Sequence, residues 1–126
     1  MILLDTSVLV DTITGPRRSL HFLRRAYDRG EFMLLPAIAL FEWLRGPRLP
    51  EEIAVQEALF PPEACPGFGP DEARIAAELY RSLPRARDRE IDLAIAASAL
   101  LMGAEVWTLN VRDFRDIPGL RLYAPD

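Results

Sequence analysis

Four short apolar segments recur along this chain, and longer segments with helical patterns separate them. They comprise residues 1–4, 32–35, 106–109 and 120–123, and they read as strands that are apolar on both faces. Strands of this kind lie in parallel sheets that helices cover on both sides. The sequence therefore predicts an α/β fold with three layers, in which a central parallel sheet lies between helices.

The segments between these strands carry helix patterns and helix stop signals. Residues 5–7 would cap a short first helix, and further helices are expected at residues 16–28, 37–44, 51–60, 71–83 and 91–102, with Gly103 as a cap. Residues 61–70 hold four prolines and two glycines, so they should be irregular or at most a short edge strand. At this length, residues 1–126 are expected to form one domain.

Composition indicates the cellular compartment of the protein and the kinds of partner it can bind. The only cysteine, Cys65, can form no internal disulfide, and the longest apolar run, residues 32–41, contains Pro36. That run is far shorter than the roughly 20 residues of a membrane-spanning helix. We therefore expect a cytoplasmic protein with no membrane partner. The net charge of −4 argues against a protein that coats nucleic acid, although all fifteen basic residues are arginine, which suits phosphate partners.

Four acidic residues stand where a carboxylate is hardest to explain. Asp5 ends the first apolar run, and Glu42 is the only charge within residues 37–44. Asp92 opens the most apolar helix of the chain, and Asp113 lies beside Phe114. A lone carboxylate removed from water costs several kcal/mol unless a cation or a donor compensates it. In parallel sheets ligands gather beyond the carboxyl ends of the strands, so Asp5 and Asp113 would lie on that rim.

Each of these acids also has a simpler structural interpretation. Asp5 could cap a helix, Glu42 could pair with a buried arginine, Asp92 could be a favourable acid in a first helical turn, and Asp113 could be a surface turn residue. The joint pattern favours a single acidic cluster.

The other residue types exclude several kinds of chemistry. The sole histidine, His21, lies on an arginine-rich helix face, and Cys65 lies in the proline-rich segment, so Cys/His or Ser/His catalysis and a zinc site are poorly supported. No glycine-rich phosphate-binding loop follows a strand. An all-oxygen site suits Mg²⁺ or Mn²⁺, which can activate water against a phosphodiester.

Several spaced motifs together resemble a known family. They are residues 2–9, the pair Phe41 and Glu42, and residues 92–100, 108–114 and 117–120. In this combination the chain resembles the PIN-domain family, and within it the VapC-type toxin ribonucleases of toxin–antitoxin pairs. The resemblance runs from end to end and implies a PIN-like α/β/α domain with a parallel sheet of four or five strands.

The resemblance also implies roles for individual residues. Asp5 and Asp92 would be the most direct metal ligands, Glu42 would act through water or orient the attacking water, and Asp113 would be a second-metal or water-mediated ligand. Two polar residues, Thr6 and Asn110, would donate hydrogen bonds that hold carboxylates in place. Some relatives carry a further acid where this chain has Asn110, so the number of metals stays open.

The implied activity is metal-dependent endonucleolytic cleavage of RNA, with transfer RNA as a possible target. The implied partners are a VapB-like antitoxin, which would block the site, and a second copy in a homodimer. Arg85, Arg87 and Arg89 could grip RNA phosphates or could form a solvated connector.

In the helix of residues 16–28, Leu20, Leu23 and Tyr27 recur at helical spacing and should face inward. Phe22 falls among the arginines of that helix instead, so it could mark a dimer or antitoxin contact or could be a singly exposed aromatic.

Two other functions stay open at this point. The first is a small-molecule phosphohydrolase with an aspartyl nucleophile, because Asp5 follows an apolar first strand. Such enzymes carry a second aspartate two residues later, where this chain has Ser7. The second is a non-catalytic interaction domain that keeps an acidic pocket for stability or RNA docking.

Overall fold

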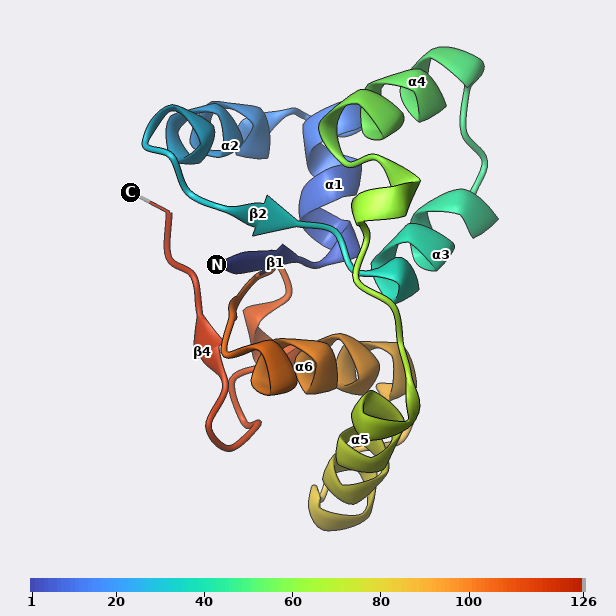
Figure 1. The fold of residues 1–126 in the computed structure, drawn as a ribbon, viewed down its shortest axis with the longest axis vertical. Coiled ribbons are helices and arrows are strands. Elements are labelled where there is room, and N and C mark those ends of the chain that lie inside the picture. Colours follow the sequence, from blue (N-terminus) through green and yellow to red (C-terminus); the bar gives the residue numbers. More distant parts are fainter. Residues whose placement is uncertain (126) are drawn as a thin grey trace.

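A computed structural model describes residues 1–125 and shows one parallel sheet between helices (Figure 1). Its strands are β1 (Ile2–Leu4), β2 (Met33–Leu34), β3 (Glu105–Trp107) and β4 (Arg121–Leu122). Their order is β2-β1-β3-β4, and all three neighbouring pairs are parallel. Leu3 lies opposite Leu34 on one side and Val106 on the other. The predicted parallel sheet is confirmed, with four strands.

The helices form where glycine, proline and apolar spacing predict them. They are α1 (Thr6–Ile13), α2 (Arg18–Asp28), α3 (Ala37–Arg45), α4 (Pro50–Leu59), α5 (Pro70–Ser82) and α6 (Glu90–Met102). Single 3₁₀ turns occur at Pro62–Ala64 and Val111–Asp113. Gly103 ends α6 with a φ of 66°, a left-handed conformation that glycine adopts without the steric penalty of a Cβ atom.

The layers follow from the order of the strands. The chain moves from β1 to β2 through α1 and α2, and then crosses back past β1 to reach β3 through α3 to α6. Because parallel crossovers are right-handed, connections that run in opposite directions along a sheet cover opposite faces. In Figure 1, β2 accordingly passes in front of α1, while α6 lies on the near side and carries α5 on its outer surface. This is the predicted three-layer arrangement.

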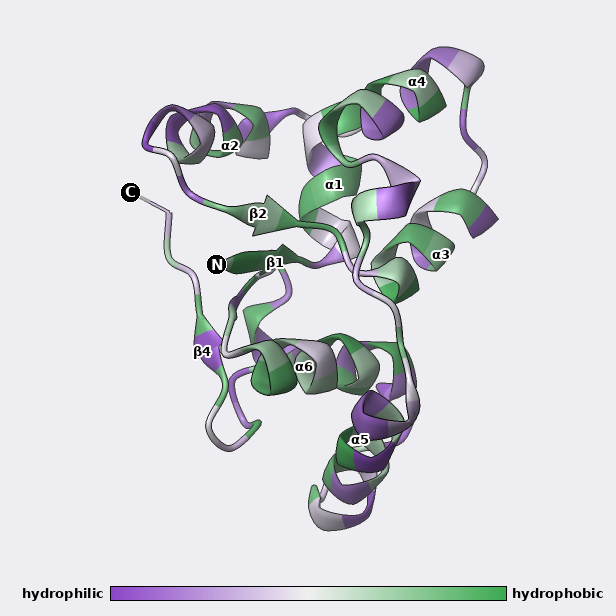
Figure 2. Ribbon diagram, viewed as in Figure 1, coloured by the Kyte–Doolittle hydropathy of each residue, from purple (hydrophilic) through white to green (hydrophobic). Residues whose placement is uncertain are grey.

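The core lies between the sheet and the two helices that flank it. All three residues of β1 are inaccessible to solvent, and the segment of α6 from Leu93 to Ala99 is buried throughout. Figure 2 shows β1 and β2 in green and α6 largely in green, whereas α2 and α5 alternate with purple. Small side chains let α6 approach the sheet closely, which fixes the position of its first turn.

The buried face of α2 differs from the predicted one. Leu20 and Tyr27 were expected to face inward, but they are exposed, and Ser19, Leu23 and Ala26 are buried instead. Phe22 is half-buried and packs against the core. Phe22 is therefore not fully exposed, because the helix is rotated relative to the simple apolar pattern, and its role as a dimer or antitoxin contact stays a prediction. No helix within residues 1–125 has the length and apolar character required to cross a membrane.

Candidate active site

A pocket opens where the chain leaves the carboxyl end of β1. Asp5, Glu42 and Asp92 line it, and each comes from a different element. Asp5 directly follows β1, Glu42 lies in the second turn of α3, and Asp92 lies in the first turn of α6. Three of the four predicted acids therefore meet in one pocket, as expected for the carboxyl-end rim of a parallel sheet.

The carboxylate of Asp5 is buried, and the protein satisfies it with hydrogen bonds. Its Oδ1 accepts from the backbone N–H of Thr6 at 2.9 Å, which caps α1. Its Oδ2 accepts from Ser7 Oγ at 2.8 Å and from Thr108 Oγ1 at 2.7 Å. Asp5 is thus both the helix cap and a member of the acidic pocket, so the two interpretations of this residue are compatible.

Ser7 and Thr108 were not predicted as site residues. Thr108 follows β3 and so reaches the same rim as Asp5 from a neighbouring strand. Its Oγ1 also accepts a hydrogen bond from the N–H of Asn110. The available signals were the positions of Ser7, two residues after Asp5, and of Thr108, directly after a strand. Hydroxyl residues are common in both places.

Glu42 is held by Thr6 rather than by a buried cation. Thr6 Oγ1 donates to Glu42 Oε1 at 2.7 Å, so Thr6 has the carboxylate contact expected of it. Glu42 Oε2 lies 3.5 Å from a guanidinium nitrogen of Arg45, whose side chain is more than half exposed. A surface pair of this kind contributes little to stability. The alternative in which Glu42 pairs with a buried arginine is therefore wrong.

Four acids line the pocket, the fourth being Asp11, which accepts a hydrogen bond from the N–H of Ser19. Asp92 is the least compensated of them. Its half-buried carboxylate receives no hydrogen bond from any of residues 1–125. Burial, reinforced by the negative charges of Asp5, Asp113 and Glu42, raises the pKa of Asp92 to about 7, against a smaller opposing effect of Arg89. A divalent cation would favour the ionised form of this group.

Asp113 and Asn110 lie at the margin of the site. Asp113 sits in the 3₁₀ turn after β3 and does not line the pocket, although its charge acts on Asp92. Asn110 does line the pocket but donates no side-chain hydrogen bond to a carboxylate within residues 1–125. In that part of the chain, no three His, Cys, Asp or Glu side chains are arranged to hold a metal ion as they stand.

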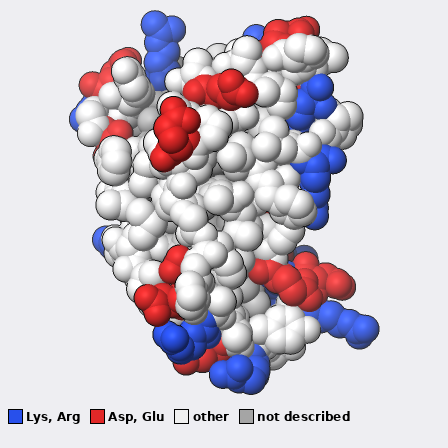
Figure 3. Space-filling model, turned by 45° about the vertical axis from the view of Figure 1, so that its right-hand side comes forward, with Lys and Arg blue, Asp and Glu red and all other residues white. Residues whose placement is uncertain are grey.

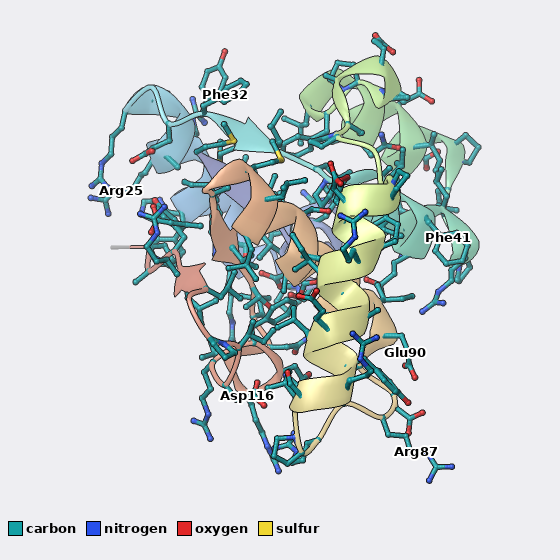
Figure 4. All side chains as sticks on the ribbon, turned by 60° about the horizontal axis from the view of Figure 1, so that its bottom comes forward. Arg25, Phe32, Phe41, Arg87, Glu90 and Asp116 are labelled. Atoms are coloured by element: carbon teal, nitrogen blue, oxygen red, sulfur yellow. The ribbon has the colours of Figure 1, made fainter. Side chains whose placement is uncertain are left out.

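The three arginines before α6 occupy different environments. Arg85 and Arg87 are exposed, and Figure 4 shows Arg87 extending from the connector into solvent. Arg89 is only 5% exposed, and its guanidinium binds both carboxylate oxygens of Asp116. The expectation that Arg89 grips RNA is therefore corrected, because its guanidinium is buried and both of its Nη atoms are bonded within the protein.

The surface around the pocket carries no broad field of one sign. Figure 3 brings the right-hand side of Figure 1 forward and shows separate acidic patches, a wide uncharged area and arginines at the margins. An acidic centre with local arginines is compatible with a nucleic-acid substrate that is held at a few phosphates.

Comparisons with known proteins agree with this geometry. Residues 2–120 match the model of the PIN domain. Ribonuclease VapC19 of Mycobacterium tuberculosis is 35% identical over 124 residues, which cover 96% of this chain and 98% of the relative.

Solved structures give the same result. DNA-bound VapBC from Salmonella typhimurium matches with a TM-score of 0.80 and 26% identity, covering 97% of this chain and 96% of the other. FitAcB from Neisseria gonorrhoeae has the same fold, with a TM-score of 0.72 at 22% identity, over 99% and 98% of the two chains. The chain therefore belongs to the PIN-domain family and is a homologue of its VapC-type ribonucleases.

Proposed function

We propose that this protein is a metal-dependent endoribonuclease of the VapC type, the toxin of a toxin–antitoxin pair. The observation that carries the proposal is the meeting of Asp5, Glu42 and Asp92 in one pocket from three separate elements. A fold that needed these acids only as caps or surface groups would have no reason to bring them together, because their mutual repulsion is unfavourable.

The donor set of the pocket fits a hard divalent cation. Carboxylate oxygens are the ligands that Mg²⁺ and Mn²⁺ prefer, and the pocket offers neither a histidine nor a thiolate. Asp5 and Asp92 would hold the ion, and Asp113 would act through water or at a second ion. When bound, the ion would offset negative charge at the phosphodiester and supply an activated water.

One acid of the pocket is held rigidly, and two others can change their side-chain conformation. Asp5 is immobilised by three hydrogen bonds, so its carboxylate would set the position of the ion. Glu42 and Asp92 are partly exposed and can turn toward it, which the present arrangement of the acids requires. Thr6 keeps Glu42 close to the pocket, where its carboxylate would orient the attacking water.

RNA is the substrate we propose, with transfer RNA as a candidate target. Arg85 and Arg87 precede α6, are exposed and flank the start of the helix that carries Asp92. We propose that they bind RNA phosphates, so neutralising both should raise KM and reduce the dependence of binding on salt. An unchanged salt dependence would leave them as a solvated connector.

The central test is cleavage of RNA by the purified protein. Total RNA is incubated with wild type, Asp5→Asn or Asp92→Asn in Mn²⁺, Mg²⁺ or chelator, and the new RNA ends are mapped. We expect each variant to lose more activity than the roughly 10–100-fold typical when a group that supports a metal ligand is removed. Glu51→Gln is the matched control, because Glu51 is an exposed acid in the first turn of α4. Equal cleavage by Asp5→Asn, or cleavage in chelator, would refute the metal-site proposal.

Two further outcomes would indicate the other functions. Turnover of an aryl phosphate without any cleavage of RNA would identify a small-molecule phosphohydrolase. A folded protein that binds RNA but cleaves nothing with either metal would identify a non-catalytic domain.

Two exposed apolar surfaces are available for the proposed protein partners. One is a groove between α2, α4 and the chain before β2, to which Tyr27 and Phe32 contribute. The other is the outer side of α3, where Phe41 and Leu44 are about half exposed. Figure 4 places Phe32 at the top of the molecule and Phe41 at its right-hand side, so the two surfaces are separate. Concave apolar grooves receive amphipathic segments of partner proteins, whereas a convex helix face can pair with its own copy.

We assign the groove to a VapB-like antitoxin and the α3 surface to a second copy in a homodimer. Replacing Tyr27 and Phe32 by serine should weaken antitoxin binding and leave the oligomeric state unchanged. Replacing Phe41 and Leu44 by serine should convert a dimer to a monomer. Each double variant is the control for the other, and sedimentation with and without antitoxin distinguishes them. The reverse pattern would exchange the two assignments.

A further inference from the structure

Arg89 forms the most elaborate polar contact of the described chain outside the acidic pocket. Its Nη2 donates to Asp116 Oδ1 and to the backbone carbonyl of Asp113, both at 2.6 Å. Its Nη1 donates to Asp116 Oδ2 at 2.9 Å and to the carbonyl of Arg85 at 2.7 Å. One buried guanidinium therefore joins the connector before α6 to the turn that carries Asp113.

This contact differs from the ordinary ion pairs on the surface. Arg74 and Asp71 form a pair at 3.1 Å in which both side chains are about two-thirds exposed. The Arg89 side chain is 6% exposed, and its Nε finds no partner within residues 1–125. A charge withdrawn from water in this way does not by itself favour folding, even when it is paired, so its geometry needs another reason.

The geometry places Arg89 between two acids of the proposed site. Arg89 is the residue at the N-terminal end of α6, and its carbonyl accepts from the N–H of Leu93 to form the first helical turn, which contains Asp92. Its guanidinium holds the carbonyl of Asp113 itself. Arg89 is thus hydrogen-bonded to the backbone at two places. One is the first turn of α6, three positions before Asp92, and the other is the carbonyl of Asp113.

The surrounding charges support the same arrangement. The hydrogen bond from Arg89 lowers the pKa of the Asp116 carboxyl, so the pair is ionised at neutral pH. The positive charge also acts on Asp92 and Asp113, but neither of their side chains bonds to it. The hydrogen bonds go instead to a carboxylate outside the pocket and to carbonyls, which leaves the acids free to face their ligand.

We propose that Arg89 is a positioning residue that, clamped by Asp116, fixes the turn carrying Asp113 relative to the helix carrying Asp92. The inference rests on the proposed function, because the position of Asp113 matters only if the acids act together on a divalent ion. It also explains why the fold buries a cation that could have bound RNA at the surface.

The test uses two variants that change the charge near the site in opposite directions. Arg89→Gln removes a positive charge and Asp116→Asn removes a negative one, but both abolish the two-fold ion pair between the two side chains. Mn²⁺ affinity is measured by calorimetry, and kcat and KM are measured on RNA. If the clamp positions Asp113, both variants should weaken Mn²⁺ binding and lower kcat by about tenfold, with KM changed by less than about twofold. Arg74→Gln breaks an exposed arginine–aspartate pair and should leave Mn²⁺ affinity, kcat and KM unchanged.

Coupling to Asp113 provides the decisive comparison. In an Asp113→Asn background, Arg89→Gln should reduce Mn²⁺ affinity by less than about twofold further, because the group that it positions is already lost. Full additivity of the two losses would overturn the proposal. Opposite effects of Arg89→Gln and Asp116→Asn on Mn²⁺ affinity would also overturn it, since these would show that Arg89 acts only through its charge.

Other outcomes separate this proposal from the proposed function. A raised KM with unchanged kcat for Arg89→Gln would show that Arg89 contacts RNA, which contradicts the clamp. If Arg89→Gln fails to fold by circular dichroism, Asp116→Asn carries the test, because its amide oxygen can still accept a hydrogen bond. If both fail to fold, the pair serves stability alone and the proposal is wrong. A wild type that binds Mn²⁺ but cleaves no RNA would refute the function, while the Mn²⁺ comparisons would still decide the role of Arg89.

Discussion

The N-terminal ends of α1 and α6 lie at the same rim of the sheet, and each carries an acid of the pocket. At α1 the fold surrounds Asp5 with three hydrogen bonds, one from a backbone N–H and two from hydroxyls. At α6 the carboxylate of Asp92 receives no hydrogen bond within residues 1–125, and burial near three other acids raises its pKa to about 7. Two aspartates at helix N-terminal ends on the same rim therefore have opposite environments.

The protein satisfies the carboxylate of Asp5 with its own hydrogen-bond donors, whereas the carboxylate of Asp92 needs a ligand. The oxygens of Asp5 have hydrogen-bond donors from the protein itself, and one of these bonds caps the start of α1. Asp92 carries a charge that the protein does not compensate, on a helix that close packing holds in place. Strongly shifted groups in a cleft are typical of functional sites, and a divalent cation would remove the disadvantage of Asp92.

The largest expected effect on stability is at Asp5, whose carboxylate the protein satisfies with hydrogen bonds. Asp5→Ala removes the acceptor of three hydrogen bonds and should lower the free energy of unfolding by about 2–4 kcal/mol. Urea unfolding near pH 5.5 measures it, because Asp92 keeps its proton there and repulsion between the two acids does not contribute. Asp5→Asn, which retains an acceptor for the Thr6 N–H, is the control and should lose less. A loss below about 1 kcal/mol for Asp5→Ala would show that the hydrogen bonds do not complete this site.

The second effect has the opposite sign. The pKa of Asp92 is higher in the folded protein than in the unfolded chain, so the folded state keeps a proton that the unfolded state loses. Without metal, stability should therefore fall as the pH rises from about 4 to about 7, and then level off. Asp92→Asn escapes this loss and should be more stable than wild type by about 1–2 kcal/mol near pH 8, after allowance for partial exposure.

The control for this prediction is the same pair of proteins at lower pH. The difference between wild type and Asp92→Asn should shrink toward zero as the pH falls below about 4, where the carboxyl becomes protonated in the unfolded chain as well as in the folded protein. Saturating Mg²⁺ at pH 8 should stabilise wild type more than the variant. A variant that is less stable than wild type at pH 8 without metal would contradict the contrast between the two helix ends.

A smaller effect is expected at one of the hydroxyls that complete Asp5. Thr108→Val keeps the shape of the side chain but removes its 2.7 Å bond to Asp5 and the acceptor for the Asn110 N–H. We expect a loss of about 1 kcal/mol in urea unfolding, since Ser7 and Thr6 still serve Asp5. Thr14→Val, which removes an exposed hydroxyl bond to a helix carbonyl, should change stability by less than about 0.5 kcal/mol. Equal effects of the two substitutions would mean that Thr108 has no special role.

Much of the fold follows from local signals in the sequence. Short runs that are apolar on both faces predict the strands of a parallel sheet, and Gly103 marks the end of α6. The acids of the pocket could be found because each stands within or beside an apolar segment. The order β2-β1-β3-β4 and the rotation of α2 depend on packing between distant segments, which the local pattern of Leu20 and Tyr27 does not report.

The polar contacts that the sequence did not predict share one physical cause. Thr108 reaches Asp5 across 103 positions of sequence, and a threonine after a strand is too common to be a signal. Arg89 lies in a run of alternating charges that is typical of a solvated connector, yet its partner Asp116 buries it from 27 positions away. Long-range polar contacts of this kind depend on the assembled fold and have no periodicity in the sequence.

The most direct test of the account is the titration of the Asp92 carboxyl by NMR, with Asp92→Asn used to assign the signal. Without divalent ions, the pKa of Asp92 should be about 7, and saturating Mg²⁺ should move it below its ordinary value near 4. Asp5→Asn should lower the metal-free pKa of Asp92, because it removes one of the repelling charges. A pKa near 4 without metal that does not change with Mg²⁺ would contradict the claim that Asp92 is the uncompensated acid of a metal site.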